Sequence, residues 1–407
     1  MPIRLNGSTS GRIEIDAPAV AGTTNITLPA TAGEILVGGT DGGSVHFPTG
    51  TTAQRPTDAQ AGDMRFNTTT GQVEYWSSTD FVPQWRAITD APQPNPIVDY
   101  LVVGGGGGGG GGYRSGGGGA GGYRTSVGTS GGNSSTETGI IITYNYAYNL
   151  VVGGGGAGGT YPSYTRGTAG SNSTFHTITA TGGGGGGGYH LGGQGAGGSG
   201  GSGGGAGGSG SNSAAGSASA NQGFDGGSSL NSSINGGGGG GGAGQAGANA
   251  GNSEGDGYGG DGLASAMITS SMATTYSVGE VVNSDVYFAG GGGGGGYSGY
   301  SNNTNTHGGS GGGGWGPSSS LNTATREPGD TNSGGGGAGA NFENNGAAGG
   351  SGVIILRTPT SINATFTSGV TANGATGSSI SPDTSISGYR TYVITAAASG
   401  QTVTFST

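Results

Sequence analysis

The chain has 407 residues, including 108 glycines and 14 prolines, and carries a formal net charge of −10 at pH 7. Collagen is excluded, because its triple helix needs glycine at every third position and abundant proline between. The absence of cysteine excludes disulfides and zinc–thiolate sites, and the absence of lysine and of any basic run argues against nucleic acid as a partner.

Residues 1–46 predict a small N-terminal β module. Short strand candidates cover residues 12–15, 25–28 and 34–37, and small or polar residues separate them. Such strands cannot bury a large core alone, so we expect them to gain partners from neighbouring subunits. The N-terminal residues show no apolar core of signal-peptide length, and no stretch of about eighteen apolar residues exists that could insert into a membrane.

A second module is expected over residues 47–90. Residues 64–67 and 72–76 alternate in polarity on either side of a glycine-containing turn, which is the pattern of a β-hairpin. A third strand is expected to close over this hairpin at the next apolar residues, which are Phe81, Val82 and Trp85.

A proline-rich linker over residues 91–97 leads into a third region, residues 98–358, which is organised by repetition. Its unit is a short apolar strand that runs straight into glycines. These strands are residues 100–103, 149–152, 178–181 and 286–289, and they enter glycine runs at residues 104–112, 153–156, 182–188 and 290–296. Further glycine runs and a closing strand follow at residues 236–242, 311–314, 334–337 and 353–356.

The long glycine runs predict a bundle of polyglycine-II helices. Such a helix has three residues per turn and no internal hydrogen bonds, so every N–H and C=O group needs an outside partner. Neighbouring helices of the same type supply those partners in three directions, and any Cβ would hold the helices apart. The alternative is a disordered glycine-rich segment, but 17 Tyr, 9 Phe and 3 Trp with 8% charged residues fit disorder poorly.

Residues 359–407 return to β character and are expected to form a small C-terminal β module. The fold class predicted from the whole sequence is therefore mainly β, with a polyglycine-II bundle anchored by a small sheet and little or no α-helix.

Aromatic and arginine side chains beside the glycine runs are the candidate binding residues. Tyr, Trp and Arg dominate protein-binding hot spots, and aromatic faces also stack on sugar rings. The alternative is that these side chains only cap the ends of the glycine helices. The candidates are Tyr113, Arg114, Tyr123, Arg124, Tyr161, Tyr164, Arg166, Tyr189, His190, Tyr297, Tyr300, His307 and Trp315.

Catalytic and cofactor chemistry find little support in the sequence. Glycine patterns typical of phosphate loops carry no information inside long glycine runs, and the histidines show no metal spacing. The acids of the central region are dispersed, so the paired carboxylates of a polysaccharide depolymerase are not visible. We expect no catalytic site and no cofactor. One weak Ca²⁺ candidate consists of Glu254, Asp256 and Asp261, for which solvated turn residues are the better interpretation.

Several segments resemble structural proteins of tailed bacteriophages. The motifs GTTAQRP, GDMRFNTTTG and YW, at residues 50–56, 62–71 and 75–76, resemble a module recurrent in tail fibres. The N-terminal segments LNGSTSG, IDAPA and TLP, at residues 5–11, 15–19 and 27–29, look like a leader of cyanophage and other marine phage fibres. Residues 100–112 and 352–357 are similar to the borders of glycine-rich domains in such fibres, and more loosely to T-even-like tip adhesins.

The resemblance implies a virion protein that attaches through its N-terminal region to other virion or tail proteins. It also implies a homotrimer whose glycine-rich loops bind a protein or polysaccharide receptor on the host surface. A head fibre or capsid decoration protein without a receptor role is the main alternative. An enzyme remains a third hypothesis, and an ice-binding polyglycine protein would need regular threonine rows that are not visible.

Overall fold

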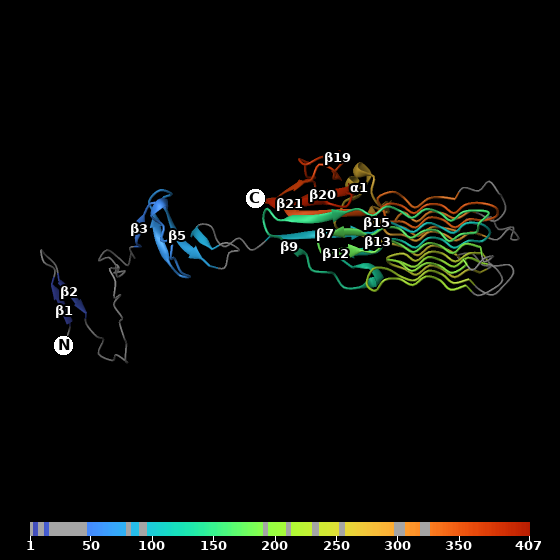
Figure 1. The fold of residues 1–407 in the computed structure, drawn as a ribbon, viewed down its shortest axis with the longest axis horizontal. Coiled ribbons are helices and arrows are strands. Elements are labelled where there is room, and N and C mark those ends of the chain that lie inside the picture. Colours follow the sequence, from blue (N-terminus) through green and yellow to red (C-terminus); the bar gives the residue numbers. More distant parts are fainter. Residues whose placement is uncertain are drawn as a thin grey trace. The chain divides into compact units, whose positions relative to one another are not determined.

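A computed structural model describes residues 3–6, 12–15, 47–78, 83–88, 96–189, 194–208, 213–229, 236–251, 257–296, 306–317 and 326–407. The chain divides into two compact units, Met1–Pro94 and Asn95–Thr407, and each is described by itself (Figure 1). The fold is mainly β, as the sequence predicted.

The first unit contains two small sheets. Strands β1 (Ile3–Asn6) and β2 (Arg12–Ile15) form an antiparallel pair. The predicted strands at residues 25–28 and 34–37 lie outside the described residues. The second sheet has the order β3-β4-β5-β6, and a short helix, η1 (Thr52–Gln54), follows β3. Its strands are β3 (Thr49–Gly50), β4 (Met64–Asn67), β5 (Gln72–Ser77) and β6 (Gln84–Ala87).

The predicted hairpin is confirmed as β4 and β5, with Met64 opposite Tyr75 and Asn67 opposite Gln72. Strand β6 supplies the expected third strand through Trp85, which pairs with Trp76. Phe81 and Val82 lie outside the described residues.

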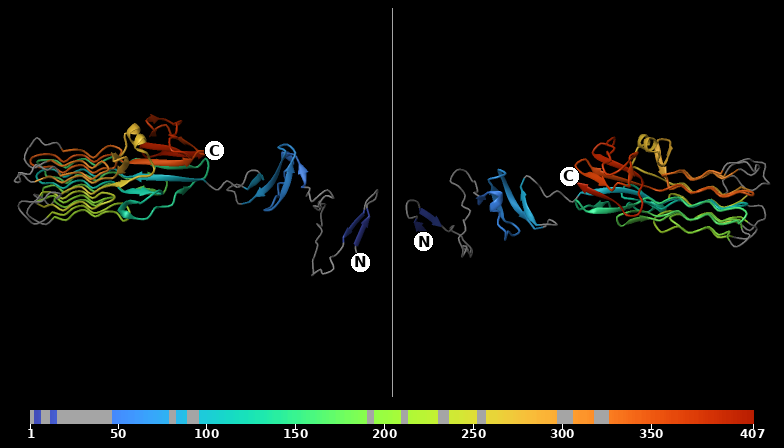
Figure 2. Two further views of the ribbon diagram at one scale, coloured as in Figure 1. Left: turned by 180° about the vertical axis from the view of Figure 1, so that it is seen from behind. Right: turned by 45° about the horizontal axis from the view of Figure 1, so that its top comes forward.

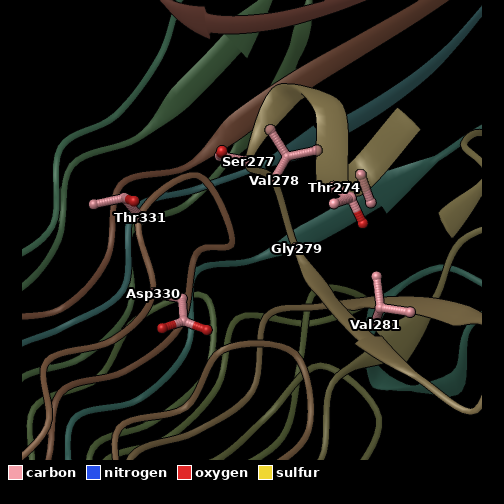
Figure 3. Close-up of a pocket in the computed structure, with 8 residues that line it drawn as sticks. Thr274, Ser277, Val278, Gly279, Val281, Asp330 and Thr331 are labelled. Atoms are coloured by element: carbon pink, nitrogen blue, oxygen red, sulfur yellow. The ribbon is translucent and has the colours of Figure 1, made fainter. Parts of the chain in front are cut away.

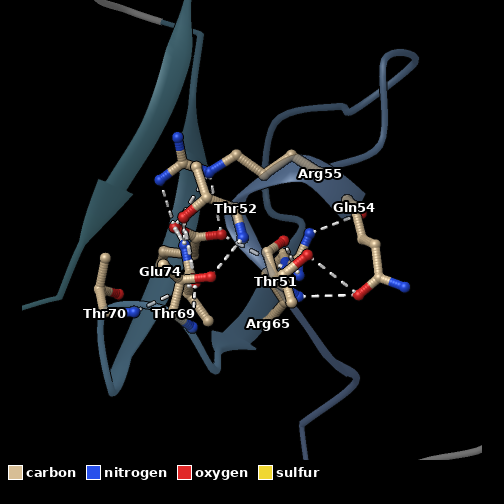
Figure 4. A network of polar contacts seen from close by, with 9 residues as sticks. Thr51, Thr52, Gln54, Arg55, Arg65, Thr69, Thr70 and Glu74 are labelled. Atoms are coloured by element: carbon tan, nitrogen blue, oxygen red, sulfur yellow. Dashed lines mark hydrogen bonds and ion pairs between the residues drawn. The ribbon is translucent and has the colours of Figure 1, made fainter.

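One face of this sheet carries a buried polar network (Figure 4). Glu74 is 2% exposed and accepts a hydrogen bond of 2.7 Å from Nη2 of Arg55 and one of 3.0 Å from Nδ2 of Asn67. Nε of Arg65 lies 3.4 Å from the same carboxylate. Arg65 also donates to the backbone carbonyls of Thr51 and Gln54. The network therefore fixes the segment around η1 onto the sheet.

We expect the stability of residues 47–88 to fall as the pH falls below 4.5. Burial alone would raise the pKa of Glu74, but the hydrogen bonds from Arg55 and Asn67 outweigh it and hold that pKa below its ordinary value of 4.5. The stabilisation is therefore present above the unfolded pKa and is lost as the pH falls through the folded pKa. Tryptophan fluorescence during acid titration measures this, since Trp76 and Trp85 lie on the sheet. An acid transition that is unchanged in Glu74→Gln would contradict it.

The second unit contains two large β-sheets. A seven-stranded sheet has the order β19-β18-β20-β16-β7-β8, with β9 also paired to β7, and a five-stranded sheet has the order β12-β11-β10-β21-β17. The first consists of β7 (Ile97–Val103), β8 (Tyr123–Thr125), β9 (Ile140–Ile141), β16 (Val353–Pro359), β18 (Thr371–Ala372), β19 (Ala375–Thr376) and β20 (Tyr389–Ala396). The second consists of β10 (Ala147–Val151), β11 (Ser173–Phe175), β12 (Ile178–Ala180), β17 (Asn363–Phe366) and β21 (Gln401–Ser406).

Strand β7 is buried on both faces. Tyr100 and Val102 belong to a core shared with the five-stranded sheet, while Leu101 and Val103 belong to a second core. Alternate side chains of a strand point to opposite faces, which explains this division. The second core is closed by α1 and a three-stranded sheet. These are α1 (Ser270–Tyr276), β13 (Leu263–Ala264), β14 (Glu280–Val282) and β15 (Asp285–Phe288).

The C-terminal strands belong to this same unit. The sequence predicted a separate module for residues 359–407, whereas β20 pairs with β16 and β21 pairs with β10. Residues far apart in the chain thus complete the sheets from which the bundle extends, because the open edges of β16 and β10 need backbone partners. The described residues also contain the short 3₁₀ helix η2 (Gly131–Asn133).

Glycine-rich segments leave the sheets side by side and form the bundle (Figure 2). We call each segment a run and residues 104–112 the central run. Gly105, Gly108 and Gly111 donate to Ser171, Thr168 and Thr165, each at an N···O distance of 3.0 Å. Every third donor therefore faces one antiparallel neighbour. The remaining donors face two other antiparallel runs in the same period, residues 115–122 and 344–350.

The carbonyl groups of the central run follow the same period of three. They accept hydrogen bonds from three further runs, as when Gly156 and Gly159 donate to Gly106 and Gly109 at 2.8 Å. The N–H groups that donate to these carbonyls belong to residues 153–159, 183–189 and 337–340. This is the bonding in three directions that the sequence predicted for packed polyglycine-II helices.

Candidate functional site

An aromatic cluster forms at the end of the bundle away from the sheets. Tyr113 follows the central run, Tyr164 ends the turn between two runs, and Tyr189 follows another run. The ring centroid of Tyr113 lies 6.4 Å from that of Tyr164, 5.5 Å from that of Tyr189 and 6.3 Å from that of Phe342. Tyr161 adds a further ring at 5.6 Å from Tyr164. We call these five residues the tip cluster.

Tight turns bring the tip cluster together. Gly112 has φ +90°, and Arg114 and Tyr164 have φ 51°, so the chain reverses through left-handed conformations. Oγ of Ser115 donates to the carbonyl of Gly112 at 3.0 Å and closes the first turn. All five rings are half-buried, so each ring contacts its neighbours and still presents surface to solvent.

Glu343 adds a carboxylate to the tip cluster. The hydroxyl of Tyr113 donates to Oε1 of Glu343 at 3.2 Å. Partial burial and then this hydrogen bond raise the pKa of Tyr113. Oδ1 of Asn345 accepts from the backbone N–H of Tyr161 at 2.8 Å. The arrangement offers aromatic faces beside hydrogen-bonding groups, which suits a ligand with both apolar and polar surface.

A second aromatic group lies on neighbouring runs of the same bundle. The His307 ring lies 4.2 Å from Trp315 and 5.0 Å from Tyr258, measured between centroids. Trp315 is 42% exposed. The sequence identified His307 and Trp315, whereas Tyr258 was missed, as were Phe342 and Glu343 of the tip cluster. The signal for Phe342 was present, because it directly follows a glycine-rich run.

Tyr123 and Arg124 are not loop residues, contrary to the expectation. They lie on β8 beside the sheets, and Tyr123 is fully buried. Nη2 of Arg124 lies 2.5 Å from Oε2 of Glu137, and this hydrogen-bonded pair raises the pKa of Arg124. Arg124 and Glu137 line a polar pocket of about 520 Å³ together with Gln222. Tyr123 and Arg124 lie on a strand because the chain, as it returns from the bundle, pairs with β7.

Arg114 and Arg166 are half-buried near the tip cluster. His190, Tyr297, Tyr300, Glu254 and Asp256 lie outside the described residues. Oδ1 of Asp261 accepts from the backbone N–H of Ser310 at 2.8 Å. The described residues contain no group of three acidic or histidine side chains able to hold a metal ion.

A further pocket, of about 320 Å³, lies beside the end of α1 (Figure 3). Thr274, Ser277 and Thr331 supply hydroxyls, and Asp330 supplies a carboxylate. Burial and then the charges of Glu280 and Glu327 raise the pKa of Asp330. None of the sequence-predicted candidates lines this pocket.

Comparison with known proteins gives one positive finding. The family described as "Glycine-rich domain" matches residues 85–359, which include the strands and runs described above. No curated protein matches the chain. No solved structure matches it either. Within the described residues, no helix is both long enough and apolar enough to cross a membrane.

Proposed function

This chain belongs to the glycine-rich domain family, and from that premise we propose that it is a tailed-phage fibre adhesin that binds a host-surface receptor through the tip cluster. Its N-terminal unit would attach it to the virion, and several copies would raise avidity. The family match concerns the glycine-rich domain alone. The phage assignment rests on the resemblance of motifs such as residues 50–56 and 62–71 to tail-fibre modules.

The observation that carries the proposal is the position of the tip cluster. Five half-buried rings gather at the free end of a bundle whose other end is fixed to sheets. Rigid aromatic side chains lose little conformational entropy on binding, which is why they dominate adaptable binding surfaces. The many inter-run hydrogen bonds hold the runs that carry these rings. Preorganisation of this kind improves affinity by reducing the cost of ordering.

We expect the double variant Tyr113→Ala/Tyr161→Ala to lose binding to susceptible bacterial cells by about tenfold or more, as for truncated hot-spot residues. Binding of the labelled full chain to susceptible and resistant cells measures this. The matched control is Tyr146→Ala, because Tyr146 is 53% exposed and lies among the sheets at the other end of the unit.

Equal binding by the double variant and the control would count against the tip cluster as the receptor site. Absence of any selective binding by the unmodified chain would favour the alternative of a head fibre or capsid decoration protein.

A further inference from the structure

The polar pocket beside β8 has the size of a small-molecule site but an unusual lining. Its volume of about 520 Å³ falls within the range of about 300–1,000 Å³ that is usual for such sites. Most ligand pockets are lined mainly by apolar side chains. Here all but one of the lining residues carry polar side chains, and these are Arg124, Ser134, Ser135, Glu137, Asn221 and Gln222. The lining therefore predicts a ligand whose surface is mostly polar.

The two charged residues that line this pocket neutralise each other. Oε1 of Glu137 accepts from Nε of Arg124 at 2.9 Å and from Oγ of Ser130 at 3.1 Å. Oε2 of Glu137 accepts from Nη2 of Arg124 at 2.5 Å and from the hydroxyl of Tyr100 at 2.9 Å. A carboxylate has about four acceptor sites, so this one is filled. Among the described residues, the pocket lining thus offers no unpaired charge, which favours a neutral ligand.

Several hydrogen-bonding groups of the lining are still available to a ligand. Two of the five N–H groups of Arg124 bond to Glu137, and a third lies 3.4 Å from the carbonyl oxygen of Thr179. Oε1 of Gln222 accepts from the backbone N–H of Thr181 at 2.7 Å, which leaves the amide NH₂ group as a donor. Ser135 and Asn221 are exposed, and their side chains can both donate and accept. Hydroxyl and ether oxygens complement such a set.

The lining is held in place from three segments, which are β8, the residues after η2, and the turn at residues 220–222. The backbone N–H of Gln222 donates to Ser219 at 3.2 Å, and its carbonyl accepts from Tyr123 at 3.0 Å. Oγ of Ser134 donates to the carbonyl of Gly131 at 2.5 Å. Groups fixed before a ligand arrives reduce the entropy lost on binding. The pocket is therefore preorganised for a polar guest.

We propose that this pocket binds a neutral saccharide. A sugar combines hydroxyl groups and ring oxygens without net charge, as the available groups require. An apolar ligand would leave the N–H groups of Arg124 and Gln222 without acceptors, which costs binding free energy. A sugar acid or phosphate would find its one cation already paired with Glu137. The pocket lies beside the sheets and the tip cluster lies at the opposite end of the bundle, so the inference does not depend on the proposed receptor site.

The test is isothermal titration calorimetry of the full chain with defined probes. The neutral probes are maltose, lactose, cellobiose and N-acetylglucosamine, and the charged comparators are glucuronate and inorganic phosphate. We expect saturable binding of at least one neutral probe and weaker binding of both anions. Absence of binding by all four neutral probes would overturn the proposal. Tighter binding of glucuronate or phosphate than of every neutral probe would overturn it as well.

Two variants locate the bound sugar. Gln222→Glu keeps the acceptor for the N–H of Thr181 but removes the NH₂ donors, and Ser135→Trp places a large side chain at an exposed edge of the pocket. Each should weaken saccharide binding by about tenfold or more, as for removed hot-spot contacts. The matched control is Ser379→Trp, because Ser379 is an exposed serine that does not line the pocket. Thermal unfolding checks that each variant is folded.

Unchanged saccharide binding in Ser135→Trp would refute the proposal, whether or not Gln222→Glu folds. An equal loss in Ser379→Trp would refute it too, because the effect would then not come from the pocket. Saccharide binding that is lost in Tyr113→Ala/Tyr161→Ala and kept in Ser135→Trp would place the sugar at the tip cluster instead.

Discussion

The replacement Gly109→Ala is expected to prevent the glycine-rich unit from folding or to destabilise it by more than about 4 kcal/mol, a loss reserved for severe structural conflicts. A Cβ at this position would overlap the backbone carbonyl of Ala338. Gly109 also donates to Ala347 and accepts from Gly159, so the central run cannot move away from one neighbour without breaking bonds to others. Thermal unfolding followed by calorimetry and resistance to proteolysis measure the effect.

Gly154→Ala is the matched control for this prediction. It makes the same chemical change in the same bundle, but a Cβ at position 154 meets no atom within 4 Å. We expect no loss of stability, and a gain of up to about 1 kcal/mol is reasonable because alanine restricts the unfolded chain. If both variants unfolded at the same temperature, close packing of the central run could not be the reason for its glycines.

The second large effect is expected from Glu74→Ala in the first unit. Removing this carboxylate leaves the buried guanidinium of Arg65, whose side chain is 6% exposed, without its anionic partner. Breaking a buried ion pair from one side costs about 3–5 kcal/mol, which a unit this small cannot lose without unfolding. Fluorescence of Trp76 and Trp85 in a Trp315→Phe background reports on this unit alone, because the chain has 3 tryptophans.

Asp58→Ala controls for the loss of one negative charge, since Asp58 is exposed in the same unit. It should change stability by less than about 0.5 kcal/mol, as surface substitutions usually do. A native tryptophan spectrum and unchanged denaturation midpoint in Glu74→Ala would show that the network contributes no net stability.

Contiguous glycines, as in residues 104–112, predicted a helix packed on all sides, because any side chain would obstruct a neighbour. Runs at the surface of the bundle were missed, because they keep glycine only where a neighbour is close. Residues 165–171 have Gly167 and Gly170 at a spacing of three, and other positions carry threonine, arginine, alanine and serine. This spacing follows from three residues per turn.

The sequence by itself determined the features that depend on local periodicity. The hairpin of β4 and β5, the apolar strands that enter the glycine runs and the need for partners in three directions all follow from the spacing of neighbouring residues. Only the tertiary structure decided which runs are neighbours, that residues 359–407 complete the sheets, and that Tyr123 is buried. Tyr113 and Glu343 meet across a sequence separation of 230 residues. Such contacts depend on how identical glycine runs pair, and identical runs carry no local signal that distinguishes one partner from another.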